Sequence, residues 1–236
     1  GRTLLIRVDA STQIGTGHVM RCLALAQAWQ EVGGSAFFVF AHHIPSLETR
    51  LRAESVEVVH LAGVHPGSEE DASATAVLGQ KHGAQWVVVD GYHFDAEYQL
   101  LLKAAGFRLL FIDDFGHAAH YYADIVLNQN IGVSIEPYQH REPYTQLLLG
   151  TPYALMRREF WDWAVWQRKF AEQGRKVLVT LGGSDPNNVT KIVVKALQQL
   201  PYDDLQVVVL VGGQNSYFHE LETAVVLDPR MQIRQN

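Results

Sequence analysis

Short apolar runs alternate with amphipathic stretches along most of this chain, and this alternation restricts its fold more than any other feature. The apolar runs at residues 4–8, 86–90 and 206–211 have the length of single strands. Strands buried on both faces of a parallel sheet read as continuous apolar runs, as these do. Helical patterns between such strands are typical of βαβ units. The sequence therefore predicts an α/β fold built on parallel sheets.

Two domains are expected from the order of these elements, at residues 1–150 and 151–236. Strands are predicted at residues 4–8, 35–40, 56–61, 86–90, 108–112, 125–127, 176–181, 206–211 and 231–234. Helices are predicted from residue 18, after Pro45, and at residues 69–82, 96–105, 156–170, 188–200 and 217–224. Residues 131–151 contain two prolines and read as an irregular connection between the domains. Both domains are expected to be Rossmann-like, and the second contains only a few elements.

Composition excludes several classes of protein. A formal net charge of −6 and the lack of a basic run argue against a nucleic-acid binder. The apolar runs are far shorter than a membrane span, and we expect no signal peptide. The only cysteine, Cys22, rules out an internal disulfide and is typical of the reducing cytoplasm, where we expect the protein. Because it lies on an apolar helical face, Cys22 is interpreted as a small core residue.

The run Gly15-Thr16-Gly17-His18 lies between the first predicted strand and a helix. A helix that opens after a glycine turn directs unpaired N–H groups at one point, which makes an anion site. His18 lies at the positive end of the helix macrodipole, which favours the neutral imidazole and therefore a general base. Arg21, one turn further, is a candidate for the same anion, with a solvent-facing arginine as the alternative.

Further candidates follow other predicted strands. Ligands bind beyond the carboxyl ends of strands in open α/β sheets. Tyr92 lies at such an end, with a packing role as the alternative, and His93 competes with it for any function. The loop at residues 182–185 lies at another such end.

Two groups of histidines are interpreted as having no metal-binding role. Asp113 and Asp114 with His117 and His120 resemble a metal cluster, but Gly116 interrupts any helix there and no further ligand pattern supports one. We therefore predict no metal at this cluster. His42 and His43 are interpreted as loop residues.

A more specific signal comes from segments spread over nearly the whole chain. They comprise residues 6–11 (IRVDAS), 14–26 (IGTGHVMRCLALA), 89–92 (VDGY), 112–114 (IDD), 124–130 (DIVLNQN), 153–160 (YALMRREF) and 181–185 (LGGSD). Their order and spacing resemble the UDP-2,4-diacetamido-2,4,6-trideoxy-β-L-altropyranose hydrolases of pseudaminic acid biosynthesis, which are grouped with spore-coat proteins.

The resemblance implies a glycosyltransferase-B-like fold in which two Rossmann-like domains face a cleft. It implies metal-independent hydrolysis of the UDP-linked sugar to UDP and free sugar, with inversion at the anomeric carbon and no cofactor. His18 and Tyr92 match the family's catalytic residues. The remaining candidates would bind substrate: Gly15, Thr16, Gly17, Arg21, Arg157, Gly182, Gly183, Ser184 and Asp185.

Family members also carry a later glycine-rich loop and a glutamate that help to hold the uridine diphosphate. No such segment occurs before Asn236, so we expect the second domain to be truncated. Two alternatives remain for the function. One is a glycosyltransferase that uses a UDP-sugar donor, and the other is a non-catalytic remnant that binds sugar nucleotides.

Overall fold

The computed structural model describes residues 2–10, 15–183, 185–213 and 215–235. The chain divides into two compact units. The first comprises Gly1–Ala10 and Thr16–Ala164, and the second comprises Ser11–Gly15 and Val165–Asn236. The main division of the chain therefore follows Ala164, somewhat later than the domain boundary expected after residue 150.

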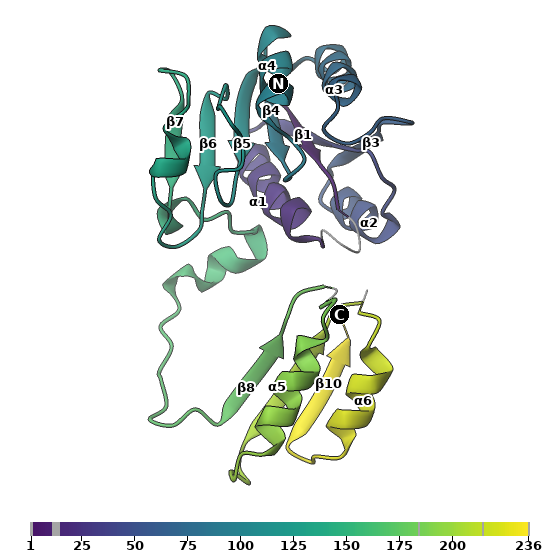
Figure 1. Ribbon diagram of the computed structural model, residues 1–236, viewed down its shortest axis with the longest axis vertical. Coiled ribbons are helices and arrows are strands. Elements are labelled where there is room, and N and C mark those ends of the chain that lie inside the picture. The colour runs from purple at the N-terminus through teal and green to yellow at the C-terminus, as the bar shows by residue number, and fades with distance from the viewer. Residues whose placement is uncertain (1, 11–14, 184, 214, 236) are drawn as a thin grey trace. The chain divides into compact units, whose positions relative to one another are not determined.

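A seven-stranded parallel sheet forms the centre of the first unit, in the order β3-β2-β1-β4-β5-β6-β7 (Figure 1). The strands are β1 (Thr3–Val8), β2 (Ser35–Phe40), β3 (Glu57–His60), β4 (Ala84–Asp90), β5 (Arg108–Ile112), β6 (Ile125–Asn128) and β7 (Gln146–Leu149). The helices are α1 (Gly17–Glu31), α2 (Pro45–Ala53), α3 (Glu69–Lys81) and α4 (Ala96–Ala104). The predicted α/β class with a parallel sheet is confirmed.

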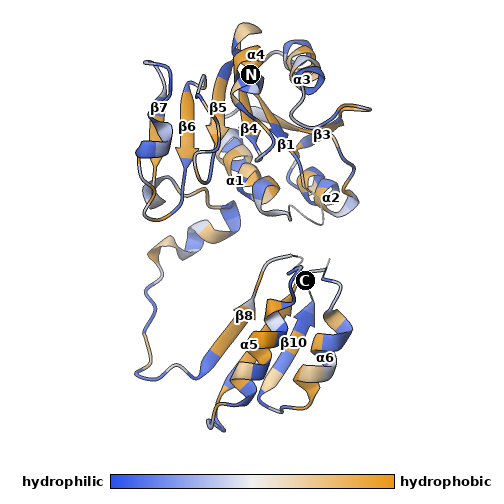
Figure 2. Ribbon diagram, in the orientation of Figure 1, coloured by the Kyte–Doolittle hydropathy of each residue, from blue (hydrophilic) through white to orange (hydrophobic). Residues whose placement is uncertain are grey.

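Two hydrophobic cores lie on the two faces of this sheet. Residues alternate between faces along a strand, so Val87 and Val89 of β4 join one core while Val88 joins the other. Helices α3 and α4 contribute to the first core, and helices α1 and α2 contribute to the second. The central strands are accordingly hydrophobic over most of their length (Figure 2). Cys22 is fully buried in the second core, which confirms its interpretation as a core residue.

Strand β7 is the main departure from the predicted elements of the first unit. Residues 131–151 were expected to be irregular, but Gln146–Leu149 pairs in parallel with β6 and extends the sheet. The prediction is wrong here because this four-residue strand lies between Pro143 and Pro152, and prolines are typical of irregular segments.

A shorter helix also replaces the one predicted at residues 156–170. The structure has a 3-10 helix, η3 (Arg158–Val165), and the chain continues irregularly from residue 166 to residue 171. Bulky aromatic residues dominate this segment, and they lose rotamer freedom in an α-helix. The apolar spacing therefore overstates the length of the helix.

The second unit is a three-stranded parallel sheet in the order β10-β9-β8, with two helices. Its elements are β8 (Lys176–Thr180), α5 (Val189–Gln198), β9 (Gln206–Val211), α6 (Phe218–Val226) and β10 (Met231–Gln235), close to the predicted bounds. Val194 of α5 and Leu221 of α6 pack against Val209 of β9 in its core. Among the helices of the described part of the chain, none combines the length and apolar character needed to cross a bilayer.

Candidate functional site

The strand order of the first unit reverses its direction between β1 and β4, and we call this position the switch point. From β1 the chain proceeds to β2 and β3 on one side, whereas from β4 it proceeds to β5 and β6 on the other (Figure 1). Connections that diverge in this way leave a crevice beyond the carboxyl ends of the two strands, where open α/β sheets bind ligands. Asp90 is the last residue of β4, and His18 lies in the first turn of α1.

Helix α1 begins with its first turn free of the usual side-chain partners. Gly15 has φ of 78°, a backbone conformation that favours glycine. Among the described residues, no side chain caps α1 at Thr16, and the first turn contains no acidic residue. By contrast, Ser68 caps α3 and Asp95 caps α4. The amides at the start of α1 thus have no side-chain cap, and the anion site there stays a prediction.

His18 and Asp90 form a buried pair at this crevice. The Nδ1 atom of His18 lies 2.6 Å from Oδ1 of Asp90, and His18 is only 7% exposed. Burial alone would raise the pKa of Asp90, but hydrogen bonds from Arg21 and His18 outweigh it and hold the pKa below its usual value. With the imidazole proton on Nδ1 and donated to the carboxylate, Nε2 carries the lone pair and is able to accept a proton.

Arg21 lies between two carboxylates. Its Nε and Nη2 donate to the two oxygens of Asp90, both at 2.7 Å. Its Nη1 and Nη2 donate to the two oxygens of Asp114, at 2.7 and 3.1 Å. Two bidentate pairs of this kind fix the plane of the guanidinium. The solvent-facing alternative for Arg21 is therefore wrong, and the predicted role in phosphate binding stays a prediction.

Tyr92 belongs to the same network. Its hydroxyl donates to Oδ2 of Asp114 at 2.9 Å, and its ring meets the ring of His18 edge to face, with centroids 4.8 Å apart. Partial burial and the Asp114 carboxylate raise the pKa of Tyr92 to about 12, so the hydroxyl stays neutral. Because its proton is donated to Asp114, the Tyr92 oxygen is left as an acceptor, and the side chain is 51% exposed.

His93, the competitor of Tyr92, lies elsewhere. Its Nε2 is 3.3 Å from Oδ2 of Asp9, and its ring packs against Phe94. Asp9 also accepts the N–H of Ala41 and contacts the buried Arg7. His93 thus contributes to a buried polar network beside the crevice, whereas Tyr92 contacts His18 directly.

A small cavity brings together three of the predicted substrate-binding residues. Gly17, Arg21 and Arg157 line a space of about 240 Å³ together with Phe160 and neighbouring apolar side chains. Arg157 donates to Glu159 at 2.8 Å and its guanidinium lies over the ring of Phe160. This cavity begins at the first turn of α1, where His18 also lies.

The remaining substrate-binding candidates belong to the second unit. Gly182 has φ of 81°, and a Cβ added to Gly212 would lie 2.2 Å from the carbonyl oxygen of Gly183. The loops after β8 and β9 therefore approach as closely as only glycine allows. The Asp185 carboxylate accepts the N–H groups of two residues at the start of α5, both at 2.9 Å, and so caps that helix. Ser184 lies outside the described residues.

The Asp113 cluster, considered above as a metal site, has other partners. One oxygen of Asp113 accepts two backbone N–H groups and the other accepts the Tyr121 hydroxyl at 2.6 Å. Burial alone would raise the pKa of Asp113, but the side chains of His117 and Tyr121 and the two backbone N–H groups outweigh it and lower the pKa to about 2. His117 donates to the carbonyl of Phe94, and His120 contacts Glu142. The cluster therefore stabilises the loop after β5.

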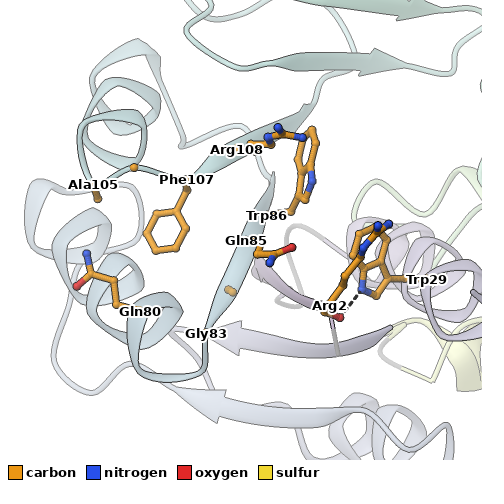
Figure 3. A pocket seen from close by; sticks show the side chains of 11 residues that line it. Arg2, Trp29, Gln80, Gly83, Gln85, Trp86, Ala105, Phe107 and Arg108 are labelled. Atoms are coloured by element: carbon orange, nitrogen blue, oxygen red, sulfur yellow. Dashed lines mark hydrogen bonds between the residues drawn. The ribbon is translucent and has the colours of Figure 1, made fainter. Parts of the chain in front are cut away.

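A larger cavity, of about 760 Å³, lies at the amino ends of β1, β4 and β5, whereas His18 lies at the carboxyl ends (Figure 3). Its lining includes Arg2 before β1, Trp86 near the start of β4, and Arg108 at the start of β5. Arg108 lies over the ring of Trp86, and Trp29 donates to the carbonyl of Arg2 (Figure 3). Because β4 is about 20 Å long at 3.3 Å per residue, this cavity is remote from His18.

Comparison with known proteins first concerns sequence. No family model matches the chain. It is 26% identical over 200 residues to the UDP-2,4-diacetamido-2,4,6-trideoxy-β-L-altropyranose hydrolase of Campylobacter jejuni, with 82% of this chain and 65% of that protein covered. It is 24% identical over 223 residues to an uncharacterized protein of Methanocaldococcus jannaschii, with 92% and 44% covered. A Helicobacter pylori protein named both pseudaminic acid cytidylyltransferase and the same hydrolase is 24% identical over 190 residues, with 80% and 30% covered. The chain thus spans about a third to two thirds of the length of these relatives.

Solved structures are similar over the whole chain. HepE of Anabaena, in a complex with UDP and glucose, has a TM-score of 0.60 at 14% identity, with 69% of its chain covered. Staphylococcus aureus MnaA in a structure with UDP also has a TM-score of 0.60, at 12% identity and 69% coverage. MurG of Acinetobacter baumannii has a TM-score of 0.55 at 14% identity, with 67% covered. The chain therefore has an α/β fold of the glycosyltransferase-B type, and its curated relatives include enzymes named as UDP-sugar hydrolases.

Proposed function

We propose that this chain carries the catalytic base of a UDP-sugar hydrolase, which releases UDP and a free 2,4-diacetamido-2,4,6-trideoxy sugar with inversion. The observation that carries the proposal is the buried His18–Asp90 pair at the switch point of the first sheet. The names of the Campylobacter and Helicobacter relatives support the reaction, and the UDP complexes of similar folds support the nucleotide. Because the chain spans only part of these relatives, the activity is proposed for the protein that contains it.

His18 acts as the general base in this mechanism. A water oxygen attacks the anomeric carbon, its proton passes to Nε2 of His18, and the carbon–oxygen bond to UDP breaks with its electron pair leaving on the diphosphate. Asp90 holds the proton on Nδ1 and stabilises the imidazolium that forms. UDP is a good leaving group, so no strong acid is needed to protonate it.

Tyr92 and the start of α1 supply positioning. The neutral Tyr92 hydroxyl, whose proton is donated to Asp114, accepts a hydrogen bond from the water or from a substituent of the sugar. The amides of Gly17 and His18 face the developing negative charge, which the helix macrodipole also favours. Arg21 neutralises Asp90 and Asp114 and keeps both in place, and Gly182 and Gly183 remain candidates for contact with the diphosphate.

The test is release of UDP by the purified protein in its encoded length, without any acceptor. His18→Ala is expected to lower turnover by about 10²–10⁴-fold, the usual contribution of a general base. His120→Gln is the matched control, because His120 contacts Glu142 and lies outside the His18 network. Turnover by His18→Ala at the level of the control would contradict the mechanism.

A glycosyltransferase is the second candidate, because the similar solved structures include a protein of Rickettsia africae named as a glycosyltransferase. The same acceptor-free assay separates the two functions, since a transferase releases UDP slowly until an acceptor is added. Calorimetric titration with UDP tests the remaining alternative, a non-catalytic binder. Binding without turnover, with or without acceptors, would favour that binder.

A further inference from the structure

Three side chains with metal-binding atoms converge at the edge of the first sheet, apart from the His18 network. They are His43 in the β2–α2 loop, Glu48 in the first turn of α2, and His60 at the end of β3. Nδ1 of His43 lies 2.5 Å from Oε1 of Glu48, and Nε2 of His60 lies 3.2 Å from the same oxygen. One ligand atom from each residue lies within 4.8 Å of the other two.

The parallel pairing of β2 with β3 explains why these residues meet. Phe40, the last residue of β2, is the register partner of His60, so the loop that carries His43 leaves the sheet beside His60. Pro45 opens α2, and Glu48 in its first turn reaches back to accept the N–H of Ile44 at 3.1 Å. The strand pair and the helix start thus fix the positions of all three residues.

The carboxylate of Glu48 is buried and oriented by a hydrogen bond, as expected for a metal ligand. Its side chain is 1% exposed, and its second oxygen accepts a hydrogen bond from Arg52 at 2.8 Å. Partners of this kind orient metal-ligating carboxylates in known metal sites. His43 is 67% exposed and His60 is 35% exposed, so the solvent side is open to a further ligand such as water.

The donor set selects the class of metal. Two imidazole nitrogens and one carboxylate oxygen are a ligand set of three-residue zinc sites, whereas Mg²⁺ and Ca²⁺ prefer oxygen alone. Zinc bonds of 2.0–2.2 Å in a tetrahedron separate the ligand atoms by about 3.4 Å, a value between the shortest distance here, 2.5 Å, and the 4.8 Å within which all three atoms lie. We propose that His43, Glu48 and His60 form a binding site for a divalent transition metal of the Zn²⁺ class.

Such a metal would tie the edge of the sheet together. Strand β3 has only four residues and lies at the edge, paired to β2 alone. A metal bound to His60, Glu48 and His43 would link β3 to α2 and to the loop after β2. The role is structural, and none of the three residues belongs to the network that we assign to the hydrolysis.

The experiment is calorimetric titration of Zn²⁺ into the tag-free protein in a buffer without chelators. Wild type is expected to bind one Zn²⁺, and His43→Gln and His60→Gln are each expected to weaken binding at least about tenfold, since loss of even an outer partner costs that much. His42→Gln and His65→Gln are matched controls, because both residues are exposed histidines close to the group in the sequence but outside it. Mg²⁺ is expected not to bind at this site.

A second measurement does not depend on the heat of binding. Zn²⁺ is expected to raise the melting temperature of wild type and of the two controls, but not of the double variant His43→Gln/His60→Gln. Zinc-edge X-ray absorption is expected to show two imidazole ligands. The proposal is overturned if wild type does not bind Zn²⁺, or if the double variant binds it with wild-type affinity.

Discussion

Single residues at the switch point have separable roles. Asp90 never touches the reacting atoms in the proposed mechanism, yet it determines which nitrogen of His18 carries the proton. An asparagine at this position keeps the size of the side chain but is able to present an N–H group to Nδ1, which favours the opposite tautomer. Asp90 is therefore a positioning residue, and its effect depends on His18.

Asp90→Asn is expected to lower the turnover of UDP-sugar by about 10²-fold or more, with a smaller change in KM, because the loss concerns the base and not the binding of substrate. Steady-state UDP release measures both constants. The double variant Asp90→Asn/His18→Ala is expected to be no slower than His18→Ala alone. Additive losses in the double variant would contradict the positioning role.

Tyr92→Phe tests the acceptor role of the tyrosine oxygen. The ring that contacts His18 is kept, and the hydroxyl that donates to Asp114 is lost. Turnover is expected to fall by about tenfold, the effect of one hydrogen bond of about 1.4 kcal/mol in the transition state. Tyr144→Phe is the matched control, since its hydroxyl donates to the carbonyl of Tyr122 away from the network. Equal turnover of Tyr92→Phe and the control would argue against the role.

The sequence predicts which residues at the switch point are functional candidates, but it does not predict which of them contact one another. His18 and Tyr92 stand out because a histidine opens a helix and a tyrosine follows a strand. That Asp90 and Asp114 share Arg21 depends on β4 and β5 being neighbours, which no local pattern states. The sequence predicts that Asp90 and Asp114 converge at the carboxyl ends of their strands, but not that Arg21 binds both. The sequence predicts His43 as a loop residue, and the spacing from His43 to Glu48 and His60 matches no metal motif that would indicate otherwise.

At the scale of elements, the helices differ in whether a side chain caps their first turn. Helix α4 is capped by Asp95, whose side chain accepts the N–H of Tyr98 at 3.0 Å, and α3 is capped by Ser68. Helices α1, α2 and α6 have no side-chain cap among the described residues. In the proposed function, an anion bound at the start of α1 would supply the partner that a capping side chain supplies in α3 and α4.

Asp95→Ala is expected to lower the free energy of unfolding by about 1 kcal/mol, the usual cost of losing a helix cap. Urea denaturation followed by circular dichroism measures this change. Glu97→Ala is the control, because Glu97 is exposed in the same turn but caps no amide. A loss in Glu97→Ala as large as that in Asp95→Ala would show that the charge near the helix start, and not the cap, matters.

Strands with a continuous apolar run were predicted closely, whereas elements with a less regular sequence pattern were not. The bounds of β2, β5 and β9 agree with the predicted ranges to the residue because each is a continuous apolar run with clear ends. Strand β7 was missed and the helix at residues 156–170 was overextended. In both places tertiary pairing or bulky aromatic residues determine the structure, and local periodicity carries little information about either.

At the scale of the whole molecule, buried carboxylates make stability depend on pH. The hydrogen bonds to Asp113 lower its pKa to about 2, below its value of 3.8 in an unfolded chain. At a pH between these two pKa values, Asp113 is protonated in the unfolded chain and ionised in the folded chain. The free energy of unfolding therefore rises with pH in this range. The stabilisation is complete above about pH 4 and is lost as the pH falls through about 2.

We therefore expect the free energy of unfolding to fall by about 2 kcal/mol between pH 4 and pH 2 through Asp113 alone, with Asp90 and Asp114 adding to the loss. Urea denaturation at several pH values measures the slope. Asp113→Asn is expected to be less stable at pH 5 and to show a shallower decline. An unchanged slope in this variant would show that Asp113 does not contribute.

The parallel pairing of β1 with β4 has a consequence for how folding and activity are linked. His18 and Asp90 are 72 positions apart and come together only where those two strands are joined. In the proposed mechanism, a chain in which β1 and β4 are not paired would contain His18 and Asp90 but would not turn over substrate. Turnover of the proposed substrate would therefore report assembly of the central sheet, and two separately expressed fragments that recover it would have restored this pairing.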